Sequence, residues 1–251
     1  MSLRLDWCSH EAAKYACEHW YSRPEMPVGK LAKIGVWDDG QFVGALIFGC
    51  GTGGVSKIGE KLGAGSFGTA ELSRIALKSH SVEVSRIISI ACKILHRAQP
   101  GLRLLLTYSD PAAGHHGGIY QGAGWTYIGK SASDSMYRDV EGVLHHSRQV
   151  SASGWKMSRG RRQQVTRQGD CERIRLEPKH RYALGLDTEM RARLAEIAQP
   201  YPKRVRSDLV DTPAVHAGEG DSNSTRTLHE TVPISGIPPI ATGDQKPIKL
   251  K

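Results

Sequence analysis

The spacing of apolar and polar residues divides the first third of the chain into one helix and a hairpin. Residues 10–20 have the spacing of a short helix, and Ser9 is placed to cap its N-terminus. Two runs rich in β-branched and aromatic residues follow at 31–37 and 41–50, separated by Asp38-Asp39-Gly40. An Asp-Gly pair between two such runs predicts a β-hairpin.

The pattern then passes through a glycine-rich stretch into alternating strands and helices. Residues 49–69 show no periodicity, and we interpret them as a long loop of a kind that is usually functional. Further on, residues 82–98 have an apolar face at helical spacing. Residues 102–109 are apolar without interruption, as in a strand covered on both faces. The predicted elements are a strand at 71–77, a helix at 82–98, a strand at 102–109, a short helix at 118–123 and a strand at 125–130.

This order of elements predicts the α/β (or α+β) class. We expect residues 1–131 to form the core and 132–206 to form a basic extension that completes the domain. Within the extension, two edge or hairpin strands are expected at 136–150 and 171–184, and a helix at 187–198. Residues 207–251 are rich in Pro, Gly, Ser and Thr, which predicts a disordered tail.

The charge of the chain indicates what kind of partner it binds. The net charge is +9, and the segment from Lys130 to Arg206 holds 17 Lys/Arg against 9 Asp/Glu. Basic surfaces bind nucleic acids because phosphate neutralisation releases counterions. We therefore expect a nucleic acid as the partner; the alternative is a soluble protein with a basic tail. The candidate DNA contacts are Arg148, Lys156, Arg159, Arg161 and Arg162.

Composition excludes several other classes. Mean hydropathy is −0.38, and the absence of an apolar run near 18 residues argues against a membrane span. The N-terminus lacks the apolar segment of a secretory signal. Five scattered cysteines without a CxxC pair argue against a disulfide framework or a structural zinc site, and favour a reducing cytosol.

The stretch 107–125 (TYSDPAAGHHGGIYQGAGW) combines chemically capable side chains at the end of a buried strand. Asp110 ends the strand, His115 and His116 lie in a glycine-rich turn, and Tyr120 lies on the next short helix. Strand ends in open α/β sheets are where ligands bind. A carboxylate, imidazoles and a phenol suit acid–base catalysis or a metal with oxygen and nitrogen ligands. The alternative is a tight connection with no chemistry.

Three other places offer weaker candidates. Glu71 begins a strand, and strict alternation would put Arg74 on the opposite face from it. The string EHWYS (18–22) brings an imidazole and aromatic rings to a helix end, where simple packing is the commoner explanation. The pair His145-His146 suits a phosphate or base-edge contact and equally suits a surface turn.

Together these strings resemble a known family. EHWYS, ELSRIAL, TYSDPAAGHHGGIYQGAGWTYIG and GVLHHSR are similar to the pattern of the Mom proteins of Mu-like phages, over about residues 8–185. The resemblance implies a GCN5-related N-acetyltransferase-like core with a mixed sheet, acting in the cytoplasm of the infected host. It implies conversion of adenine in DNA to N6-carbamoylmethyl-adenine, which protects phage DNA from restriction. Iron, and acetyl-CoA or a related acyl or carbamoylmethyl donor, are the cofactors it implies.

The resemblance also assigns roles to residues of this sequence. The catalytic candidates are Tyr21, Glu71, Ser85, Asp110 and Tyr120. The metal candidates are His19, Asp110, His116 and Tyr120. The cofactor-binding candidates are Arg74, Ser81 and Arg86. In the acetyltransferase fold, the tyrosine at the position of Tyr120 protonates the departing thiolate. One departure is the turn KSHSVEVSR (78–86), which lacks the glycines that bind pyrophosphate in that fold.

The product chemistry limits the mechanism. A carbamoylmethyl group is joined to adenine N6 through its methylene carbon, so ordinary acetyl transfer to the amine does not make it. We therefore expect metal assistance or another activated donor. The target base must also leave the duplex, and Trp20, Tyr21 and Tyr108 are candidates for the walls that receive it. The alternatives are an acyl-CoA-dependent N-acetyltransferase for a protein or small amine, and a DNA-binding protein without catalysis.

Overall fold

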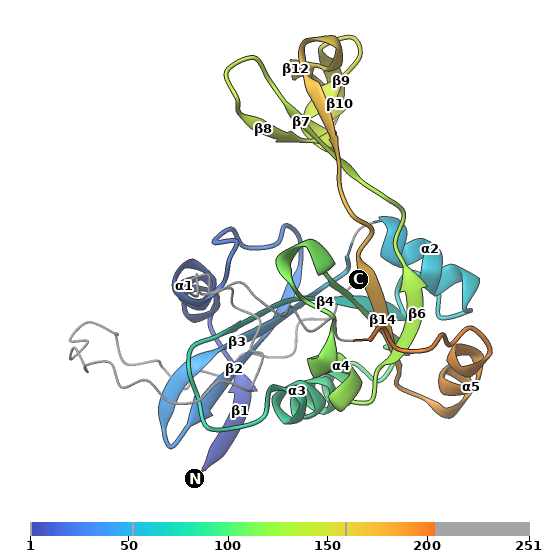
Figure 1. The fold of residues 1–251 in the computed structure, drawn as a ribbon. Helices are drawn as coiled ribbons and strands as arrows, with labels where there is room; N and C mark the ends of the chain where they lie inside the picture. Colours follow the sequence, from blue (N-terminus) through green and yellow to red (C-terminus); the bar gives the residue numbers. More distant parts are fainter. Residues whose placement is uncertain (1, 52, 159, 204–251) are drawn as a thin grey trace.

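The computed structural model describes residues 2–51, 53–158 and 160–203 (Figure 1). The tail predicted at 207–251 and the proposed DNA contact Arg159 lie outside these residues. So does the side chain of Arg148.

A mixed seven-stranded sheet forms the centre of the molecule, in the order β1-β2-β3-β4-β5-β14-β6. Its strands are β1 (Leu3–Trp7), β2 (Leu31–Asp38), β3 (Gln41–Gly49), β4 (Thr69–Leu77), β5 (Leu104–Ser109), β6 (Thr126–Lys130) and β14 (His180–Gly185). Only β4 and β5 pair in parallel; the other neighbours are antiparallel. The predicted α/β class is confirmed by this arrangement.

The hairpin predicted from Asp-Gly is formed by β2 and β3. Both residues of its turn have positive φ, 46° at Asp39 and 80° at Gly40. This is the backbone of a type I′ turn, whose twist matches that of the flanking strands. The chemistry of the turn therefore sets the register of the hairpin.

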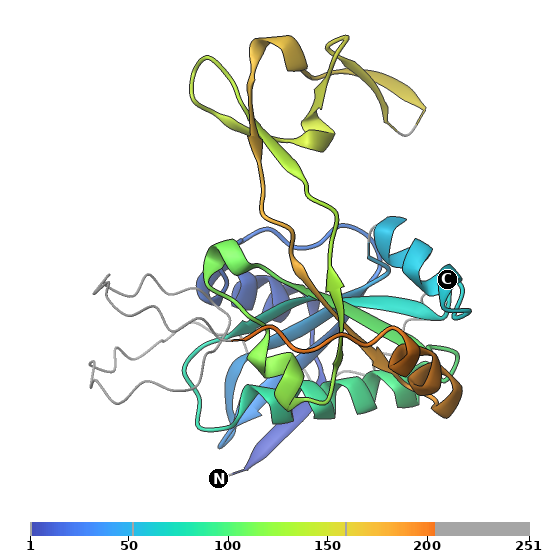
Figure 2. The ribbon, with the colours of Figure 1, turned by 45° about the vertical axis from the view of Figure 1, so that its right-hand side comes forward.

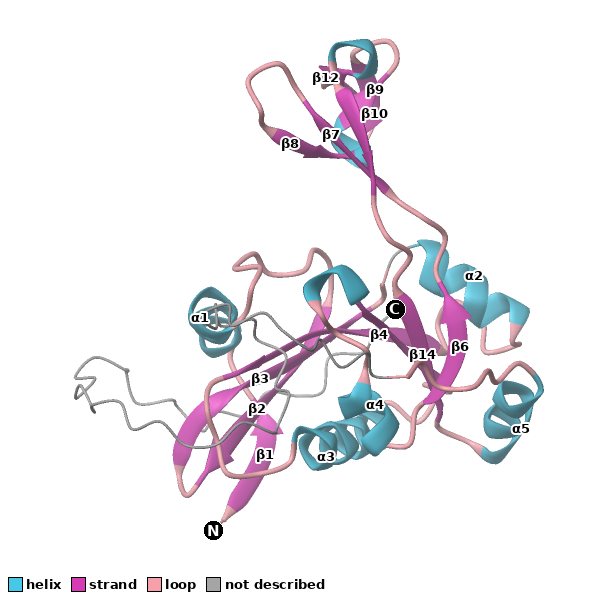
Figure 3. Cartoon of the chain, viewed as in Figure 1, coloured by secondary structure: helices cyan, strands magenta, loops and turns pink. Residues whose placement is uncertain are grey.

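Helices cover both faces of the sheet (Figures 1 and 3). On one face, α1 (His10–Trp20) packs over β2 and β3, while α2 (Gly53–Lys61) and α5 (Thr188–Glu196) share a second apolar cluster. On the other face, α3 (Val84–Ala98) and α4 (Gly118–Gly122) cover the largest cluster. Within the part of the chain that the structure describes, no helix is both long and apolar enough to cross a membrane.

The prediction of an irregular loop over 49–69 was wrong, because α2 lies within it. The glycines that disguised the helix allow it to pack closely. A Cβ atom on Gly59 would lie 2.1 Å from Thr69 Oγ1 of β4. Only glycine permits this approach of helix to strand, so the segment is a packed helix in spite of its composition.

Residues 132–179 form an arm that projects away from the sheet (Figures 1 and 2). Its strands are β7 (Ser135–Arg138), β8 (Leu144–His146), β9 (Val150–Ser151), β10 (Trp155–Ser158), β11 (Arg161–Gln164), β12 (Thr166–Arg167) and β13 (Glu172–Arg175). The two chain segments at its base are joined by backbone hydrogen bonds, from Ser131 N to Lys179 O and from Leu176 N to Asp134 O.

The strand expected over 171–184 as an edge or hairpin strand is instead two strands with different places. Its first part, β13, belongs to the arm, where it pairs with β7. Its last part, β14, lies in the central sheet between β5 and β6. Residues from His180 onward therefore belong to the core, and the arm is inserted between β6 and β14.

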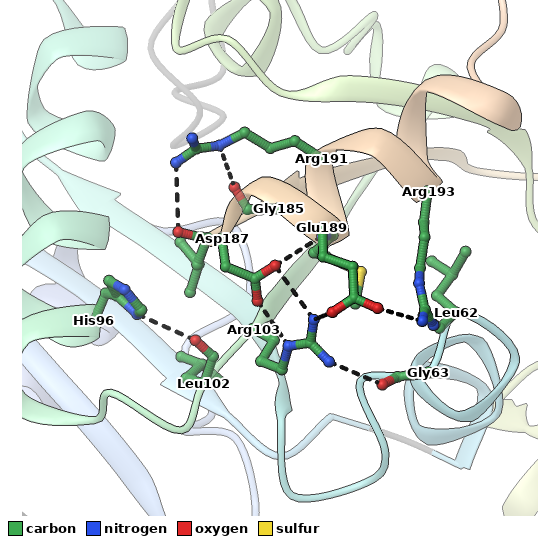
Figure 4. Close-up of polar contacts among 12 residues, drawn as sticks. Leu62, Gly63, His96, Leu102, Arg103, Gly185, Asp187, Glu189, Arg191 and Arg193 are labelled. Carbon is green, nitrogen blue, oxygen red and sulfur yellow. Dashed lines mark hydrogen bonds and ion pairs between the residues drawn. The ribbon is translucent and has the colours of Figure 1, made fainter.

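Helix α5 is fastened to the core by an ionic network (Figure 4). Arg103, just before β5, donates from Nε to Asp187 Oδ2 at 2.7 Å and from Nη2 to Glu189 Oε2 at 2.7 Å. Asp187 is also the N-cap of α5 and accepts a hydrogen bond from Met190 N at 2.7 Å. This network holds the strand–helix unit that follows the arm.

Candidate functional site

Polar side chains cross three strands on the face of the sheet that carries α1 and α2. Alternation along β5 places Leu106 and Tyr108 on this face, in the cluster beneath α2. Glu71 of β4 is opposite Leu106, and Arg181 of β14 is opposite Tyr108. Glu71, Tyr108 and Arg181 therefore form a diagonal row, which we call the polar row.

The ionisation of Tyr108 reflects its position between the other two members. Burial raises the pKa of its phenol, and the nearby carboxylate of Glu71 raises that pKa further. The guanidinium of Arg181 opposes both by lowering the pKa. The net shift is upward, so the phenol keeps its proton at neutral pH and is available as a hydrogen-bond donor.

The parallel ladder between β4 and β5 ends beside this row. Its register covers Thr69–Glu71 of β4 and Leu104–Leu106 of β5. One residue further on, the hydroxyl of Thr107 donates to the carbonyl of Leu72 at 3.0 Å in place of a backbone bond. The polar row thus lies where β4 and β5 stop pairing, in the first third of β4 and beside the carboxyl end of β5, and carboxyl strand ends are where open α/β sheets place ligands.

An ion pair extends the polar row toward the base of the arm. Lys179 Nζ lies 3.2 Å from Asp110 Oδ2, one residue beyond the ends of β14 and β5. The other oxygen, Asp110 Oδ1, accepts a hydrogen bond from Ala112 N at 3.2 Å. Asp110 therefore lies near the predicted site, but its carboxylate is held by a lysine that ends the arm.

Arg74 lies on the same face as Glu71, contrary to the prediction from strict alternation. The register of β4 against β3 shifts between Ile47 and Phe48, which are opposite Arg74 and Leu72. This β-bulge at Ser73 turns the following side chain to the other face. The guanidinium of Arg74 consequently lies over the ring of Tyr21, with Cζ 5.1 Å from the ring centre.

Two guanidinium nitrogens on this face have unused hydrogen-bonding capacity. Among the described residues, Arg74 Nε and Arg181 Nε are buried without a hydrogen-bond partner. Other nitrogens of the same side chains do bond, to Ser73 O at 2.8 Å and Ile128 O at 3.3 Å. Buried donors without partners are costly in a folded protein, and a bound polar or anionic group is one way to satisfy them.

Tyr120 lies away from the polar row. It is 3% exposed and belongs to the core on the α3 face, where its ring centre lies 5.7 Å from that of Trp125 and 5.5 Å from that of Tyr182. The backbone of His116 is tied to this same face, because Tyr182 OH donates to His116 O at 2.6 Å. The structure therefore does not assemble Asp110 and Tyr120 into one site.

The remaining metal and catalytic candidates are also dispersed. His19 is exposed at the end of α1, stacked 4.0 Å from Tyr15, with Nδ1 2.9 Å from Tyr15 O. Ser85 packs against Gly122 between α3 and α4. Among the described residues, no group of three or more His, Cys, Asp and Glu is arranged to hold a metal ion. The expected ligand set does not fit iron, and we derive no step through a metal.

The turn before α3 does not match a pyrophosphate site. Both donors of Ser81, its backbone N–H and its hydroxyl, bond to Asp38 Oδ2, at 2.9 and 2.7 Å. The N-cap of α3 is the acidic residue Glu83. Its side chain makes no capping hydrogen bond, but its negative charge at this end of the helix would oppose a phosphate. Arg86 is exposed on the first turn. These residues do not fit the usual binding of a coenzyme A pyrophosphate.

The arm contains the predicted DNA contacts that the structure describes. Arg161 and Arg162 are exposed on β11. Lys156 on β10 is only half-exposed, because its Nζ donates to Ser147 O at 2.9 Å. The two histidines pair with acids of the arm, His145 with Asp139 at 2.7 Å and His146 with Asp134 at 3.4 Å. The interpretation of His145-His146 as part of a surface turn fits these contacts.

Sequence reasoning missed two members of the site, Lys179 and Arg181. They lie about 70 residues after Tyr108 and Asp110, and only the insertion of β14 beside β5 brings them together. The available signal was the string KHRYALG, a basic entry into an apolar strand. It did not indicate which strand would be the neighbour.

Fold and site define a mixed α/β protein with a polar site at the base of a basic arm. The chain belongs to the Mom protein family, whose model matches residues 2–203. This confirms the resemblance stated from the motifs, and at the level of the family it places the chain among phage DNA-modification proteins.

Individual relatives are more distant. The chain is 27% identical to the protein named methylcarbamoylase mom of Escherichia phage Mu, over 177 residues, which cover 68% of this chain and 71% of that protein. Two solved structures of the aminoglycoside acetyltransferase AAC(6′)-Ib, one with coenzyme A and kanamycin and one with coenzyme A, are similar in fold. Each match covers 59% of this chain and 96% of the other, with 11% identity and a TM-score of 0.37.

Proposed function

We propose that this protein is a DNA-modifying transferase that converts adenine in double-stranded phage DNA to N6-carbamoylmethyl-adenine, in the cytoplasm of an infected bacterium. One observation carries the proposal. In a chain of the Mom family, the polar row lies at the base of a basic arm that rises from the same side of the sheet (Figures 1 and 2). Duplex DNA held by the arm's cations would thus lie over the row.

The reaction needs a bond between adenine N6 and the methylene carbon of the donor. N6 loses a proton as this bond forms, and the group that leaves the methylene carbon takes the bonding electrons with it. Glu71 is the carboxylate of the polar row, and we assign to it the acceptance of the N6 proton. The carboxylate packs closely against Gly51, where an added Cβ would be 2.8 Å from Oε2, so only glycine at this position leaves the Glu71 side chain where it is.

The remaining members of the row, Tyr108 and Arg181, suit the donor, together with the neighbouring Arg74. Tyr108 keeps its proton and can donate a hydrogen bond to a carbonyl oxygen of the donor. Arg74 and Arg181 each have a buried Nε donor without a partner in the described structure, and both are suited to the negative charge of a leaving group. The donor class is therefore a small molecule with an amide or acyl carbonyl and an anionic leaving group.

The adenine must be extruded from the duplex to reach this face. Extrusion costs a few kcal/mol, which stacking against aromatic walls in part offsets. Tyr108 lies in the row, and Tyr21 lies beneath the guanidinium of Arg74. These two rings are the walls that we assign to the extruded base.

Expression of the protein in bacterial cells that carry a plasmid tests the proposal, because the cell supplies the donor. We expect mass analysis of plasmid nucleosides to reveal adenine with an added carbamoylmethyl group. Glu71→Gln should abolish the adduct, whereas Phe67→Ala should not, because Phe67 is 79% exposed and lies outside the polar row. Unmodified adenine together with newly acetylated amines would refute the proposal and favour the N-acetyltransferase alternative.

A further inference from the structure

The hairpin of β10 and β11 in the arm has one face that is not packed against protein in the described structure. Its register pairs Trp155 with Gln164 and Met157 with Arg162. These four side chains therefore lie on one face of the two-stranded ribbon. Trp155 is 42% exposed and Met157 is 69% exposed, and both polar partners are exposed as well. We call this surface the ribbon face.

The opposite face of the hairpin is turned toward the arm. Lys156 lies on that face, between Trp155 and Met157, and its Nζ donates to Ser147 O at 2.9 Å. This contact joins the hairpin to the rest of the arm on the Lys156 side, where Arg161 and Gln163 remain exposed. Figure 2 shows the hairpin projecting outward from the rest of the arm, and the exposure of Trp155 and Met157 makes the ribbon face accessible.

Arginine and the indole are already paired on the ribbon face. The guanidinium of Arg162 lies over the ring of Trp155, with Cζ 4.5 Å from the ring centre. Such a cation–π contact holds a large aromatic ring in one orientation at an exposed position. Arg161, the neighbouring residue of β11, is a second exposed cation, on the opposite face of the ribbon. An apolar surface bordered by cations is complementary to bases bordered by phosphates.

We infer that the ribbon face inserts into the major groove of duplex DNA, with Trp155 and Met157 against base edges and Arg161 and Arg162 at the phosphates. The inference rests on the proposed function, since DNA is its partner. A two-stranded β-ribbon fits the width of the major groove. Apolar side chains there contact base edges such as the thymine methyl group, whereas a surface that bound phosphates alone would need no exposed indole.

Binding of the full-length protein to a fluorescent duplex, measured by anisotropy over a series of salt concentrations, tests this inference. Trp155→Ala and Met157→Ala should each weaken binding, by about tenfold for the tryptophan. The slope of log affinity against log salt should not change for either, because an apolar contact releases no counterions. Arg161→Gln should lower that slope by about 1. Trp155→Phe should retain most of the affinity if the ribbon remains folded.

Phe67→Ala is the matched control, because it removes an exposed aromatic ring that lies outside the arm. This variant should bind DNA as the wild type does. Wild-type affinity in both Trp155→Ala and Met157→Ala would overturn the inference and leave the proposed function standing. A change of salt slope in Trp155→Ala like that of Arg161→Gln would also overturn it, since it would indicate a phosphate contact. Failure of the wild-type protein to bind duplex DNA would overturn the proposed function as well.

Discussion

Asp187 combines two stabilising roles at the start of α5, and substitution can separate them. Its carboxylate accepts the capping hydrogen bond from Met190 N and pairs with Arg103 at 2.7 Å through Nε and 3.3 Å through Nη2. Asp187→Ala removes both interactions. Asp187→Asn keeps an oxygen for the cap and removes the negative charge, because asparagine is as good an N-cap as aspartate.

The structure sets the size of each effect. Loss of the cap costs about 1 kcal/mol. The hydrogen bond from Arg103 and, after it, the capping hydrogen bond from Met190 N lower the pKa of Asp187 from 3.8 to about 2, which by linkage corresponds to roughly 2.4 kcal/mol for the two together. The side chains are 36% exposed for Asp187 and 29% for Arg103, so solvent screening reduces this to about 1 kcal/mol. We expect losses of about 2 kcal/mol for Asp187→Ala and about 1 kcal/mol for Asp187→Asn.

The contribution of the Asp187 charge to folding stability depends on pH. Because the folded-state pKa is depressed, the charge of Asp187 contributes stability above the unfolded pKa of 3.8, and the contribution is lost as pH falls toward 2. Urea unfolding at pH 7 should therefore distinguish the wild type from Asp187→Asn, and the difference should shrink progressively below pH 4. A difference that stays constant down to pH 2, or wild-type stability of Asp187→Asn at pH 7, would contradict the ion-pair explanation.

Three further predictions concern packing and the arm. Gly59→Ala should lower the free energy of unfolding in urea by about 1–3 kcal/mol, because its Cβ would overlap Thr69. Gly53→Ala is the control in the same assay. It should leave stability almost unchanged, because a Cβ there meets nothing within 4 Å. Tyr182→Phe should cost about 1–2 kcal/mol in thermal or urea unfolding, since it leaves the carbonyl of His116 without this buried donor, and an unchanged midpoint would contradict that bond. Asp139→Asn should loosen the β7–β8 turn and speed amide hydrogen exchange at Val143, whose N–H bonds to Asp139. The pKa of Asp139 is lowered, mainly by its hydrogen bond to His145, so the wild type should show the same loosening as pH falls through the acid range. Equal exchange at Val143 in both proteins at pH 7 would contradict this role of Asp139.

Local chemistry made much of the core predictable. The Asp39-Gly40 turn set the β2–β3 hairpin, and the apolar run that contains β5 indicated a strand covered on both faces. The helical spacing of α3 was equally clear. Where glycine serves packing and not flexibility, composition misled the prediction, as at Gly59 in α2.

The site was only partly predictable, for reasons of topology and geometry. Glu71 and Asp110 were found from their places at strand ends, but Arg181 joins Tyr108 only through the insertion of β14. The bulge at Ser73 reversed the face of Arg74, and neither feature has a signature in a single sequence. Tyr120 follows Asp110 by ten residues, yet it turns into the opposite face of the sheet.

The insertion of the arm between β6 and β14 makes it a very long hairpin loop of the central sheet. The strand that carries Arg181, β14, follows the arm's last strand β13 after only four residues, 176–179, which are not in a strand. The Asp110–Lys179 ion pair fastens this connection to the end of β5, so a displacement of the arm would be transmitted to Arg181 through these few residues. The position of the arm and the alignment of Arg181 in the polar row are therefore coupled through this short connection.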